Sequence, residues 1–296
     1  MVSWIMACVK STKFFICLNG GIHGYFKGGR GLRQGDPISP YPFTLVMKVF
    51  NLIMCKNIRE SRDFGYHFGC KELKLSHLCF ADDLLVFYKG NVESLNVIKS
   101  SLEEFAHVSG LTPNLWKSII FFGSVNEEDK SDLLQVLPFK CGKLPVRYLG
   151  VPLLAKKLGT VDCKVLIDRV KSKIECWKYK ILSYAGRIQL IASVLSSMQL
   201  YWASVYMLPN YVIKEIEKLL KGFFWNGGGS AKGRAIVAWK VVCRPKEQGG
   251  LGVKDLKRWN EVLLIRQFWK ILLKENSLWA TWVKVVIKKD KYLGGG

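Results

Sequence analysis

The stretch "LCFADDLLVF", residues 78–87, places two adjacent aspartates, Asp82 and Asp83, inside a run of otherwise apolar or small residues. Removing one carboxylate from water is costly unless it is paired or bound to a metal, and a second carboxylate beside it raises the cost. Two short apolar segments, 73–81 and 84–88, flank the pair, which predicts a β-hairpin with the aspartates at its tip. The motif alone is compatible with an ordinary exposed turn or with a functional site.

The elements around this hairpin alternate between helix and strand. Upstream, "GLRQGDPISP" (residues 31–40) precedes a predicted helix whose shared apolar face is Phe43, Val46, Val49, Phe50, Ile53 and Met54. The helix start is placed at Asp36-Pro37, although Pro40 and Pro42 leave that start open. Downstream, residues 91–110 predict a helix with Asn91 as N-cap, Gly110 as terminator, and Leu95, Ile98, Leu102 and Phe105 facing inward. A buried strand is expected in "KSIIFFG" (117–123), so residues 1–123 read as an α+β arrangement.

The chain becomes mainly helical after Gly123. A short helix is expected at 127–136, and a strand or hairpin edge at "VRYLGVPLL" (146–154). Helical patterns follow at about 161–180, 184–207, 210–224, 255–274 and 277–288. These features predict three parts, residues 1–125, 126–226 and 227–296. Eight of the ten tryptophans lie between Trp177 and Trp282, and their helical spacing favours core anchors over base-stacking platforms.

The charge balance points to a polyanionic partner. The 296 residues carry a formal net charge of +22, and nucleic acid is the commonest partner of so basic a protein. Lys164, Lys171 and Lys178 recur at helical spacing, with Arg169 and Lys173 nearby. The alternative is a generally basic, soluble surface.

Several other classes of protein and site are disfavoured. The nine cysteines include no C-x-x-C pair, which fits reduced thiols in an intracellular, nuclear or cytoplasmic protein. His67, Cys70, His77 and Cys79 match no zinc spacing, so no metal is expected there. Residues 188–213 carry no charge, but polar residues interrupt them. They predict a core helix rather than a membrane span, with Ile191, Val194, Leu195, Met198, Trp202 and Val205 at helical spacing.

Paired carboxylates on a rigid hairpin suit two-metal chemistry. Two Mg²⁺ ions held by acidic side chains activate a 3′-hydroxyl and stabilise a leaving pyrophosphate. Arg33, Gln34 and the Gly35 backbone, just before a helix, are candidates to face a nucleotide or template strand. Lys117 in "NLWKS" (114–118) is a candidate to neutralise or protonate the leaving phosphate.

These pieces, in this order, resemble the palm of reverse transcriptases, and more narrowly the non-LTR, LINE-type retrotransposon enzymes of plants. "GLRQGDPISP" resembles the template- and nucleotide-contacting motif B, and "FADD" (80–83) resembles the metal-binding motif C, with Phe80 where many relatives carry Tyr. "NLWKS" is similar to motif D, and "YLGVPL" (148–153) to the primer grip, which implies roles for Tyr148, Leu149 and Gly150. The resemblance implies a partial palm followed by a helical thumb and connection. It also implies Mg²⁺ or Mn²⁺ at Asp82 and Asp83, and an RNA template, a DNA primer and dNTPs as partners.

The chain departs from the family pattern at the third metal-binding aspartate. In the family this residue lies on a strand upstream of motif B, whereas no Asp or Glu precedes Asp36 here, and Asp36 lies inside motif B. The fingers would also precede residue 1. We therefore expect a truncated reverse transcriptase with an incomplete two-metal site, inactive as this chain. The alternatives are a non-enzymatic, basic nucleic-acid-binding remnant, or a poorly folded product with an unpaired strand edge.

Overall fold

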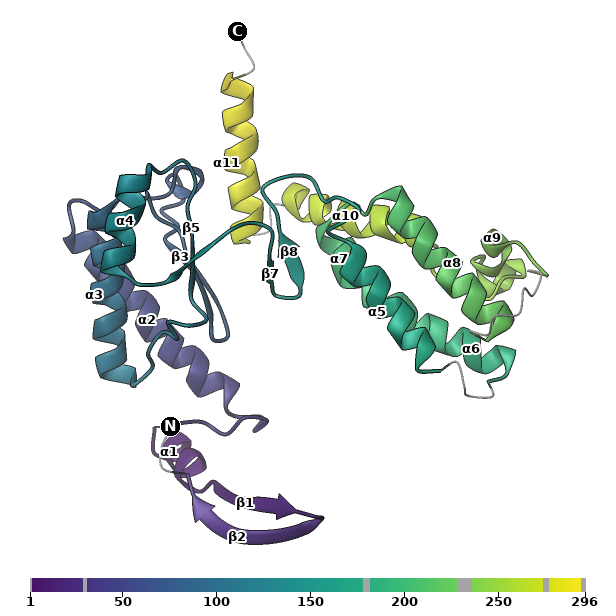
Figure 1. Cartoon of the computed structure of the whole chain (residues 1–296), viewed down its shortest axis with the longest axis horizontal. Coiled ribbons are helices and arrows are strands. Elements are labelled where there is room, and N and C mark those ends of the chain that lie inside the picture. Colours follow the sequence, from purple (N-terminus) through teal and green to yellow (C-terminus); the bar gives the residue numbers. More distant parts are fainter. Residues whose placement is uncertain (1, 29–30, 178–181, 228–235, 274–276, 294–296) are drawn as a thin grey trace. The chain divides into compact units, whose positions relative to one another are not determined.

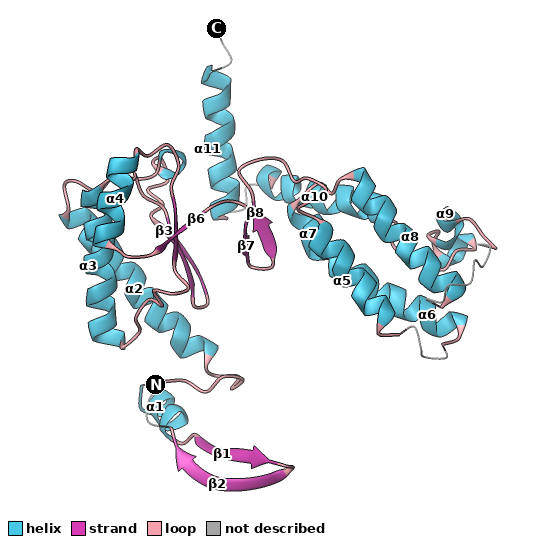
Figure 2. Cartoon of the chain, in the orientation of Figure 1, coloured by secondary structure: helices cyan, strands magenta, loops and turns pink. Residues whose placement is uncertain are grey.

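The computed structural model describes residues 2–28, 31–177, 182–227, 236–273 and 277–293. The chain forms two compact units, Met1–Gly142 and Lys143–Gly296 (Figure 1). Every described sheet has two strands (Figure 2). The first unit mixes helices and strands, and the second is mainly helical, which confirms the predicted α+β class. The division into three parts stays a prediction.

The first unit opens with a helix and a hairpin that the sequence analysis did not predict. Helix α1 (Val2–Lys10) precedes strands β1 (Lys13–Leu18) and β2 (Gly21–Lys27), which pair antiparallel. Both residues of the connecting turn have positive φ, 48° at Asn19 and 81° at Gly20, as a type I′ turn requires. Asn-Gly between two apolar runs was the signal available in the sequence.

The core of the first unit lies where α2 (Pro40–Glu60) packs on α3 (Val92–Ser109). Helix α2 begins at Pro40, later than the predicted Asp36-Pro37 start. Its inward side chains include Phe50, Ile53 and Met54, as predicted. Val49 is exposed, so its assignment to the buried face was wrong: it lies about 100° of helix rotation from Phe50, at the edge of that face.

Helix α3 has the predicted ends. Gly110 follows it with φ +72°, and its N–H donates to the Ala106 carbonyl at 2.8 Å. Asn91 occupies the N-cap position, but its side chain makes no capping hydrogen bond and instead donates to the Glu93 carboxylate at 2.6 Å. Of the predicted inward residues, Leu95, Ile98 and Phe105 are buried and Leu102 is partly buried.

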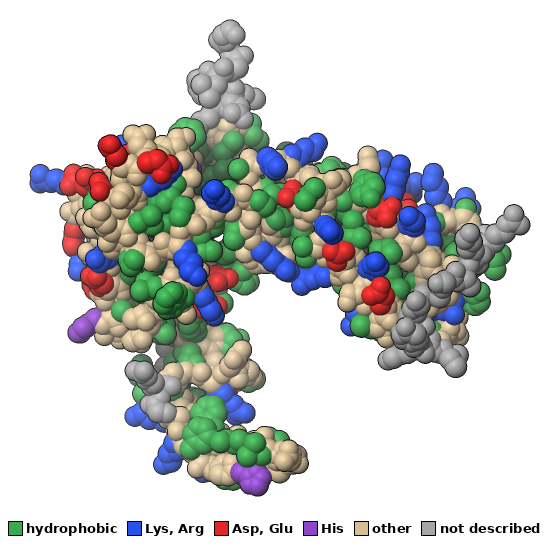
Figure 3. Space-filling model, viewed as in Figure 1, with side chains coloured by type: hydrophobic (Ala, Val, Ile, Leu, Met, Phe, Trp, Pro, Cys, Tyr) green, Lys and Arg blue, Asp and Glu red, His purple; other side chains and the backbone are tan. Residues whose placement is uncertain are grey.

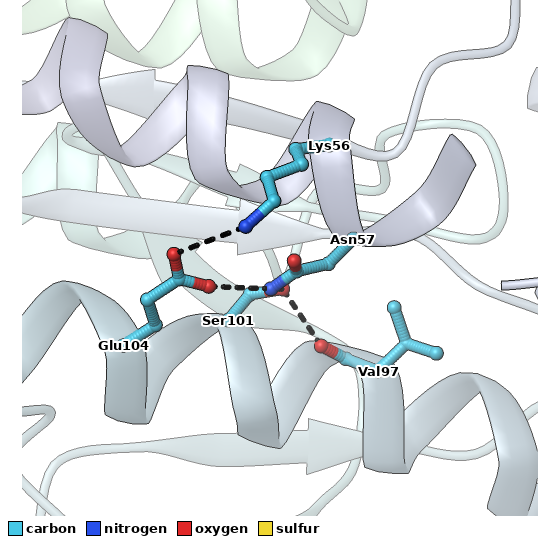
Figure 4. A network of polar contacts seen from close by, with 5 residues as sticks. All are labelled: Lys56, Asn57, Val97, Ser101 and Glu104. Carbon is cyan, nitrogen blue, oxygen red and sulfur yellow. Dashed lines mark hydrogen bonds and ion pairs between the residues drawn. The ribbon is translucent and has the colours of Figure 1, made fainter. Parts of the chain in front are cut away.

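A polar network ties α2 to α3 (Figure 4). The Asn57 amide nitrogen donates to the Ser101 hydroxyl and to the Glu104 carboxylate, both at 3.1 Å. Ser101 in turn donates to the Val97 carbonyl at 2.7 Å. Lys56 lies 3.8 Å from the other Glu104 oxygen, with both side chains substantially exposed. Both hydrogens of the Asn57 amide are therefore used, and they fix the rotation of one helix against the other.

The rest of the first unit is built from short elements. They are the 3₁₀ turn η1 (Phe68–Cys70), β3 (His77–Phe80), β4 (Asp83–Val86), β5 (Ile119–Phe121), α4 (Glu127–Val136) and β6 (Lys140–Gly142). Helix α4 has the predicted bounds. Strand β5 pairs in parallel with β6, which the sequence analysis did not anticipate. The prediction of a buried strand at 117–123 was only partly right, because Ile120 is buried while Ile119 is exposed.

The second unit begins with a hairpin and continues as helices. Strands β7 (Val146–Tyr148) and β8 (Val151–Leu153) pair antiparallel. The helical elements that follow are α5 (Lys164–Glu175), α6 (Tyr184–Leu190), the π-helical turn η2 (Ile191–Leu195), α7 (Ser196–Val205), α8 (Asn210–Asn226), α9 (Trp239–Val242), the 3₁₀ turn η3 (Lys246–Gln248), α10 (Leu256–Leu272) and α11 (Leu278–Leu293).

The uncharged segment predicted as a core helix runs through α6, η2 and α7. Residues Tyr184–Val205 are long and apolar enough to cross a bilayer by length and composition, with a mean hydropathy of 1.2. Ile191, Leu195 and Trp202 nevertheless lie in the buried cluster of the second unit. Val205 is exposed, which corrects its predicted inward position: it is the last residue of α7.

The tryptophans divide between two environments. Trp202 and Trp239 are buried, and Trp177 and Trp225 are partly buried, as predicted for core anchors. The prediction was wrong for four residues of α10 and α11, which are exposed: Trp259, Trp269, Trp279 and Trp282. Helical spacing places such residues on one face but does not determine whether another element covers that face.

Candidate functional site

The two aspartates lie at the turn of the β3–β4 hairpin. The strands pair antiparallel from His77 opposite Val86 to Phe80 opposite Asp83, which leaves Ala81 and Asp82 as a two-residue turn. Ala81 has φ +50°, and positive φ at the first turn residue alone is the sign pattern of a type II′ turn. The predicted hairpin is confirmed, with Asp82 in the turn and Asp83 opening β4.

The two faces of this hairpin have different surroundings. On one face, the buried His77 ring meets the Phe50 ring edge to face, with 5.3 Å between centroids, and Leu84 and Val86 pack against the same α2–α3 core. Directly paired residues share a face, and side chains alternate along each strand. Phe80 and Asp83 therefore lie together on the opposite face, where both are exposed.

Asp82 and Asp83 do not bear the desolvation cost that their sequence context suggested. Both are exposed, and no ion pair among the described residues involves either one. Their oxygens are hard ligands that suit Mg²⁺ or Mn²⁺, so the residues fit a metal as a partial set of ligands. Within the described parts of the chain, no group of three or more His, Cys, Asp or Glu residues is arranged to hold a metal ion.

The loop that carries Arg33, Gln34 and Gly35 is exposed and is braced at its base. Gly35 has φ +87°, a conformation that favours glycine. The Arg33 carbonyl accepts a hydrogen bond from the Ser39 hydroxyl at 2.7 Å. Asp36 accepts from the Ile38 N–H at 3.1 Å through a carboxylate oxygen, so it stabilises the turn that leads into α2. This places the Arg33 and Gln34 side chains in solvent beside the start of a helix.

Lys117 lies at an Asx turn just before β5. The Asn114 side-chain oxygen accepts from the N–H groups of Trp116 at 3.0 Å and of Lys117 at 3.2 Å. Lys117 is exposed. Over the residues that the structure describes, no hydrogen bond or ion pair joins Lys117 or Arg33 to Asp82 or Asp83, so the joint site stays a prediction.

The predicted primer-grip residues form the turn of the β7–β8 hairpin in the second unit. Leu149 (φ +47°) and Gly150 (φ +85°) follow Tyr148 as a type I′ turn. The Trp202 indole N–H donates to the Gly150 carbonyl at 3.2 Å, and the Tyr206 hydroxyl donates to the Pro152 carbonyl. Helix α7 and the residue after it therefore hold this hairpin, and these two aromatic anchors were not predicted as part of the site.

Three of the four residues that match no zinc spacing have local structural roles, and the fourth, Cys79, is exposed. The His67 ring nitrogen accepts from the Gly69 N–H at 3.2 Å, at the start of η1. Cys70 is buried. His77 contacts the Ser76 hydroxyl at 2.9 Å through Nδ1, and burial lowers its pKa below the ordinary value of 6.5.

Positive charge is unequally divided between the two units. The first carries 16 Lys and Arg and 13 Asp and Glu, a formal net charge of +3. The second carries 29 Lys and Arg and 10 Asp and Glu, a formal net charge of +19. On the face shown in Figure 3, acidic side chains gather over α3 and α4 of the first unit.

The predicted lysine face on α5 is interrupted by acids. Lys164 and Lys171 are exposed, but Asp168 and Glu175 occur four residues after each of them, on the same stripe of the helix. Lys178 lies outside the described residues. The charge of the second unit is therefore distributed along the chain rather than concentrated on this face.

The first unit and the beginning of the second match a known family. Residues 2–153, just over half of the chain, match the sequence profile described as reverse transcriptase (RNA-dependent DNA polymerase). The match covers the Asp82-Asp83 hairpin, the Arg33–Gly35 loop, Lys117 and the Tyr148–Gly150 turn.

Three individual relatives were compared, and two of them match well beyond residue 153. An Arabidopsis thaliana protein whose name describes a ribonuclease H protein is 34% identical over 144 residues, 49% of this chain and 23% of the relative. A Xenopus laevis protein of transposon TX1 is 22% identical over 99% of this chain and 22% of its own length. The retrovirus-related Pol polyprotein of a Drosophila melanogaster type-2 retrotransposable element is 24% identical over 79% of this chain and 22% of its own. The chain thus spans less than a quarter of the length of each of these relatives.

Proposed function

This chain belongs to the reverse transcriptase (RNA-dependent DNA polymerase) family, and we propose that Asp82 and Asp83 are its metal ligands for template-directed nucleotidyl transfer. The observation that carries the proposal is the geometry of the β3–β4 hairpin. Its inner face is anchored on α2 through His77 and Phe50, and its turn presents two exposed carboxylates without an ion-pair partner among the described residues.

Each proposed ligand has a rigid mount. Asp83 is the first residue of β4, and its position follows from its pairing with Phe80. Asp82 is the second residue of the turn, so its backbone is fixed by the same two strands. A divalent ion held there would supply Lewis-acid stabilisation of the phosphoryl oxygens and of the attacking 3′-hydroxyl. The residues contribute negative charge and hard oxygen ligands, already exposed to solvent.

Other residues of the family motifs have supporting roles in this proposal. Arg33 and Gln34 contact the template and the incoming nucleotide from the loop before α2. Lys117 neutralises or protonates the departing phosphate, which requires a cation near the site. The Tyr148–Gly150 turn guides the primer. The RNA template, DNA primer and dNTP are the partners that these roles require.

We propose further that the 296 residues hold only part of the catalytic carboxylate set. No Asp or Glu precedes Asp36, and the described residues contain no cluster of three metal-ligating side chains. Two-metal catalysis needs oxygen ligands that both ions share, so these residues alone would not position the primer hydroxyl. A third carboxylate supplied by another polypeptide segment would complete the site.

Non-enzymatic nucleic-acid binding is the second candidate function, and the charge of the second unit favours it. A formal charge of +19 on residues 143–296 suits neutralisation of phosphates, which needs no metal. This function predicts Mg²⁺-independent binding with a steep dependence on salt. The two functions are compatible, because phosphate contacts by lysines and arginines do not compete with the proposed metal ligands.

The origin that we propose is a plant LINE-type retrotransposon, with the protein in the nucleus or cytoplasm. The alignment with the transposon TX1 protein over 99% of the chain and the 34% identity to the Arabidopsis protein support this origin.

Mn²⁺ binding tests the proposed ligands directly. Free Mn²⁺ would be measured by electron paramagnetic resonance during titration of the wild-type chain and of the Asp82→Asn, Asp83→Asn variant. We expect the variant to lose the tightest binding. Glu127→Gln, Glu128→Gln is the matched control, because it removes another adjacent pair of exposed carboxylates from the same unit. Equal loss in both variants would mean that Mn²⁺ responds to charge alone and would refute the assignment.

A further inference from the structure

Trp116 is unusually exposed for a tryptophan in a folded unit. It lies in the segment between α3 and β5, and 81% of its surface is accessible to solvent. A ring of this size contributes strongly to stability only when it is buried. Its exposure therefore argues against a role in the core of the first unit.

The backbone beneath this ring is ordered. The Asn114 side-chain oxygen accepts from the Trp116 N–H at 3.0 Å and from the Lys117 N–H at 3.2 Å. The Asn114 carbonyl also accepts from Lys117 at 3.1 Å and from Ser118 at 2.9 Å. The turn leads directly into β5, whose pairing with β6 fixes its other end. Trp116 is thus projected into solvent from a braced turn.

Positive charge accompanies the ring. The Lys140 ammonium group lies 5.8 Å from the centroid of the Trp116 ring, within cation–π range. The backbone of Lys140 is held in place because its main-chain N–H donates to the Ser118 carbonyl, at the start of the β5–β6 pairing. Lys117 is the next residue after the ring, and no Asp or Glu occurs between Glu104 and Glu127. The surroundings of the ring in sequence are therefore cationic and free of acids.

We propose that Trp116, Lys117 and Lys140 form a binding site for one unpaired nucleotide of RNA or DNA. The base stacks on the indole and the lysines contact the adjacent phosphates, a combination that single-strand-binding proteins use without sequence preference. The inference rests on the proposed function, in which this chain binds nucleic acid. It adds a base-stacking contact through Trp116, beside Lys117, and stacking on a tryptophan needs no divalent ion.

Affinity for single-stranded oligonucleotides tests the site. Fluorescently labelled oligo(A) of RNA and of DNA would be titrated with wild-type chain, Trp116→Ala and Trp116→Phe, without divalent ions and at several salt concentrations. Loss of one stacked base weakens binding about 5- to 160-fold, so we expect that range for Trp116→Ala and a much smaller loss for Trp116→Phe. The salt dependence should be the same for all three. Lys140→Gln should instead make the negative slope of log affinity against log salt shallower by about 0.7.

Two controls identify stacking. Oligonucleotides of the same length with abasic residues offer phosphates but no base, so wild-type and Trp116→Ala chains should bind them equally. Trp4→Ala removes another exposed tryptophan, 80% accessible, from the same unit and should leave affinity unchanged. A Trp116→Ala loss that persists on abasic strands, or that Trp4→Ala reproduces, would overturn the site.

The result also separates this site from the proposed function. If Trp116→Ala binds as tightly as the wild-type chain, with the same salt dependence, the stacking site is refuted. Nucleic-acid binding by the chain would still stand. Failure of the wild-type chain to bind any strand would refute both. If Trp116→Ala weakens binding of only the RNA or only the DNA oligonucleotides, the site is supported and that nucleic acid is its ligand.

Discussion

Phe80 and Asp83 face each other as the last residue pair of the β3–β4 hairpin, and both side chains are exposed. This pairing determines which face carries the carboxylate. A slip of one residue would turn Asp83 towards the α2–α3 core and Leu84 towards solvent. The position of the proposed metal ligand therefore depends on the two-residue turn between them.

The backbone conformation of the turn predicts how a substitution of Ala81 changes stability. Its φ of +50° lies in the region that glycine adopts at little cost and other residues avoid. We expect Ala81→Gly to raise the free energy of unfolding of the first unit by about 0.5–1 kcal/mol, measured by urea denaturation. Ala106→Gly, in the interior of α3, should instead lower it by about 1 kcal/mol. The same sign for both variants would contradict the positive-φ turn.

Asn57 should matter more than its charged neighbour Lys56. Asn57→Ala removes two hydrogen bonds between α2 and α3, one of them to a carboxylate, and should cost about 2 kcal/mol in the same assay. Lys56→Ala removes an exposed contact of 3.8 Å and should cost less than about 0.5 kcal/mol. Equal costs would show that the amide does not hold the two helices together.

His77 should make the first unit less stable in mild acid. Burial lowers its pKa in the folded state below 6.5, so the unfolded chain binds the proton more readily. The stability contributed by neutral His77 is complete above pH 6.5 and is lost as the pH falls through the lowered pKa of the folded state. Urea denaturation between pH 7.5 and 5 should show this loss, and His77→Leu should reduce it.

The control for this prediction is an exposed histidine. His107→Gln removes such a residue from α3, and loss of the pH dependence in this variant but not in His77→Leu would contradict the prediction. If the His77→Leu variant loses as much stability between pH 7.5 and 5 as the wild-type chain does, another group causes the pH dependence.

Two buried amides of the second unit should respond oppositely to apolar substitution. Asn260 donates to the Ala203 and Tyr206 carbonyls at 2.7 and 2.8 Å and accepts from the Leu208 N–H at 2.8 Å. Asn260→Leu leaves these groups unsatisfied and should destabilise the chain by about 3 kcal/mol or more.

Gln199 is the contrasting case. Its side chain is buried, and within the described residues neither its amide nitrogen nor its oxygen has a hydrogen-bond partner. Gln199→Met has nearly the same volume and removes that desolvated polar group, so it should be neutral or stabilising by about 1 kcal/mol. Thermal unfolding of both variants checks the pair, and a large destabilisation by Gln199→Met would contradict the contrast.

Local patterns in the sequence predicted the elements around the site well. The hairpin at Asp82 and Asp83, the helix from Asn91 to Gly110 and α4 all rest on short-range signals such as turns and caps, which act within a few residues. The exposed outer face of the hairpin was not predicted, because Leu78 and Phe80 are apolar and hide the alternation that usually distinguishes the two faces.

Features that depend on distant parts of the chain were harder to predict. The parallel pairing of β5 with β6 joins residues about twenty positions apart and has no local signal. The exposure of Trp269 on α10 depends on whether another element covers that face, which helical spacing does not state. The role of Asn260, whose three hydrogen bonds join α10 to the end of α7, likewise has no local signal in the sequence.

Primer extension on an RNA template tests whether these 296 residues hold a complete set of catalytic metal ligands. The 296-residue chain and its Asp82→Asn, Asp83→Asn variant would be assayed with Mg²⁺ and with Mn²⁺, with template binding measured in parallel. We expect no extension by either protein and equal, salt-sensitive binding by both. Extension by the wild-type chain that the variant abolishes would contradict an incomplete carboxylate set, because the remaining metal ligands would then lie within these 296 residues.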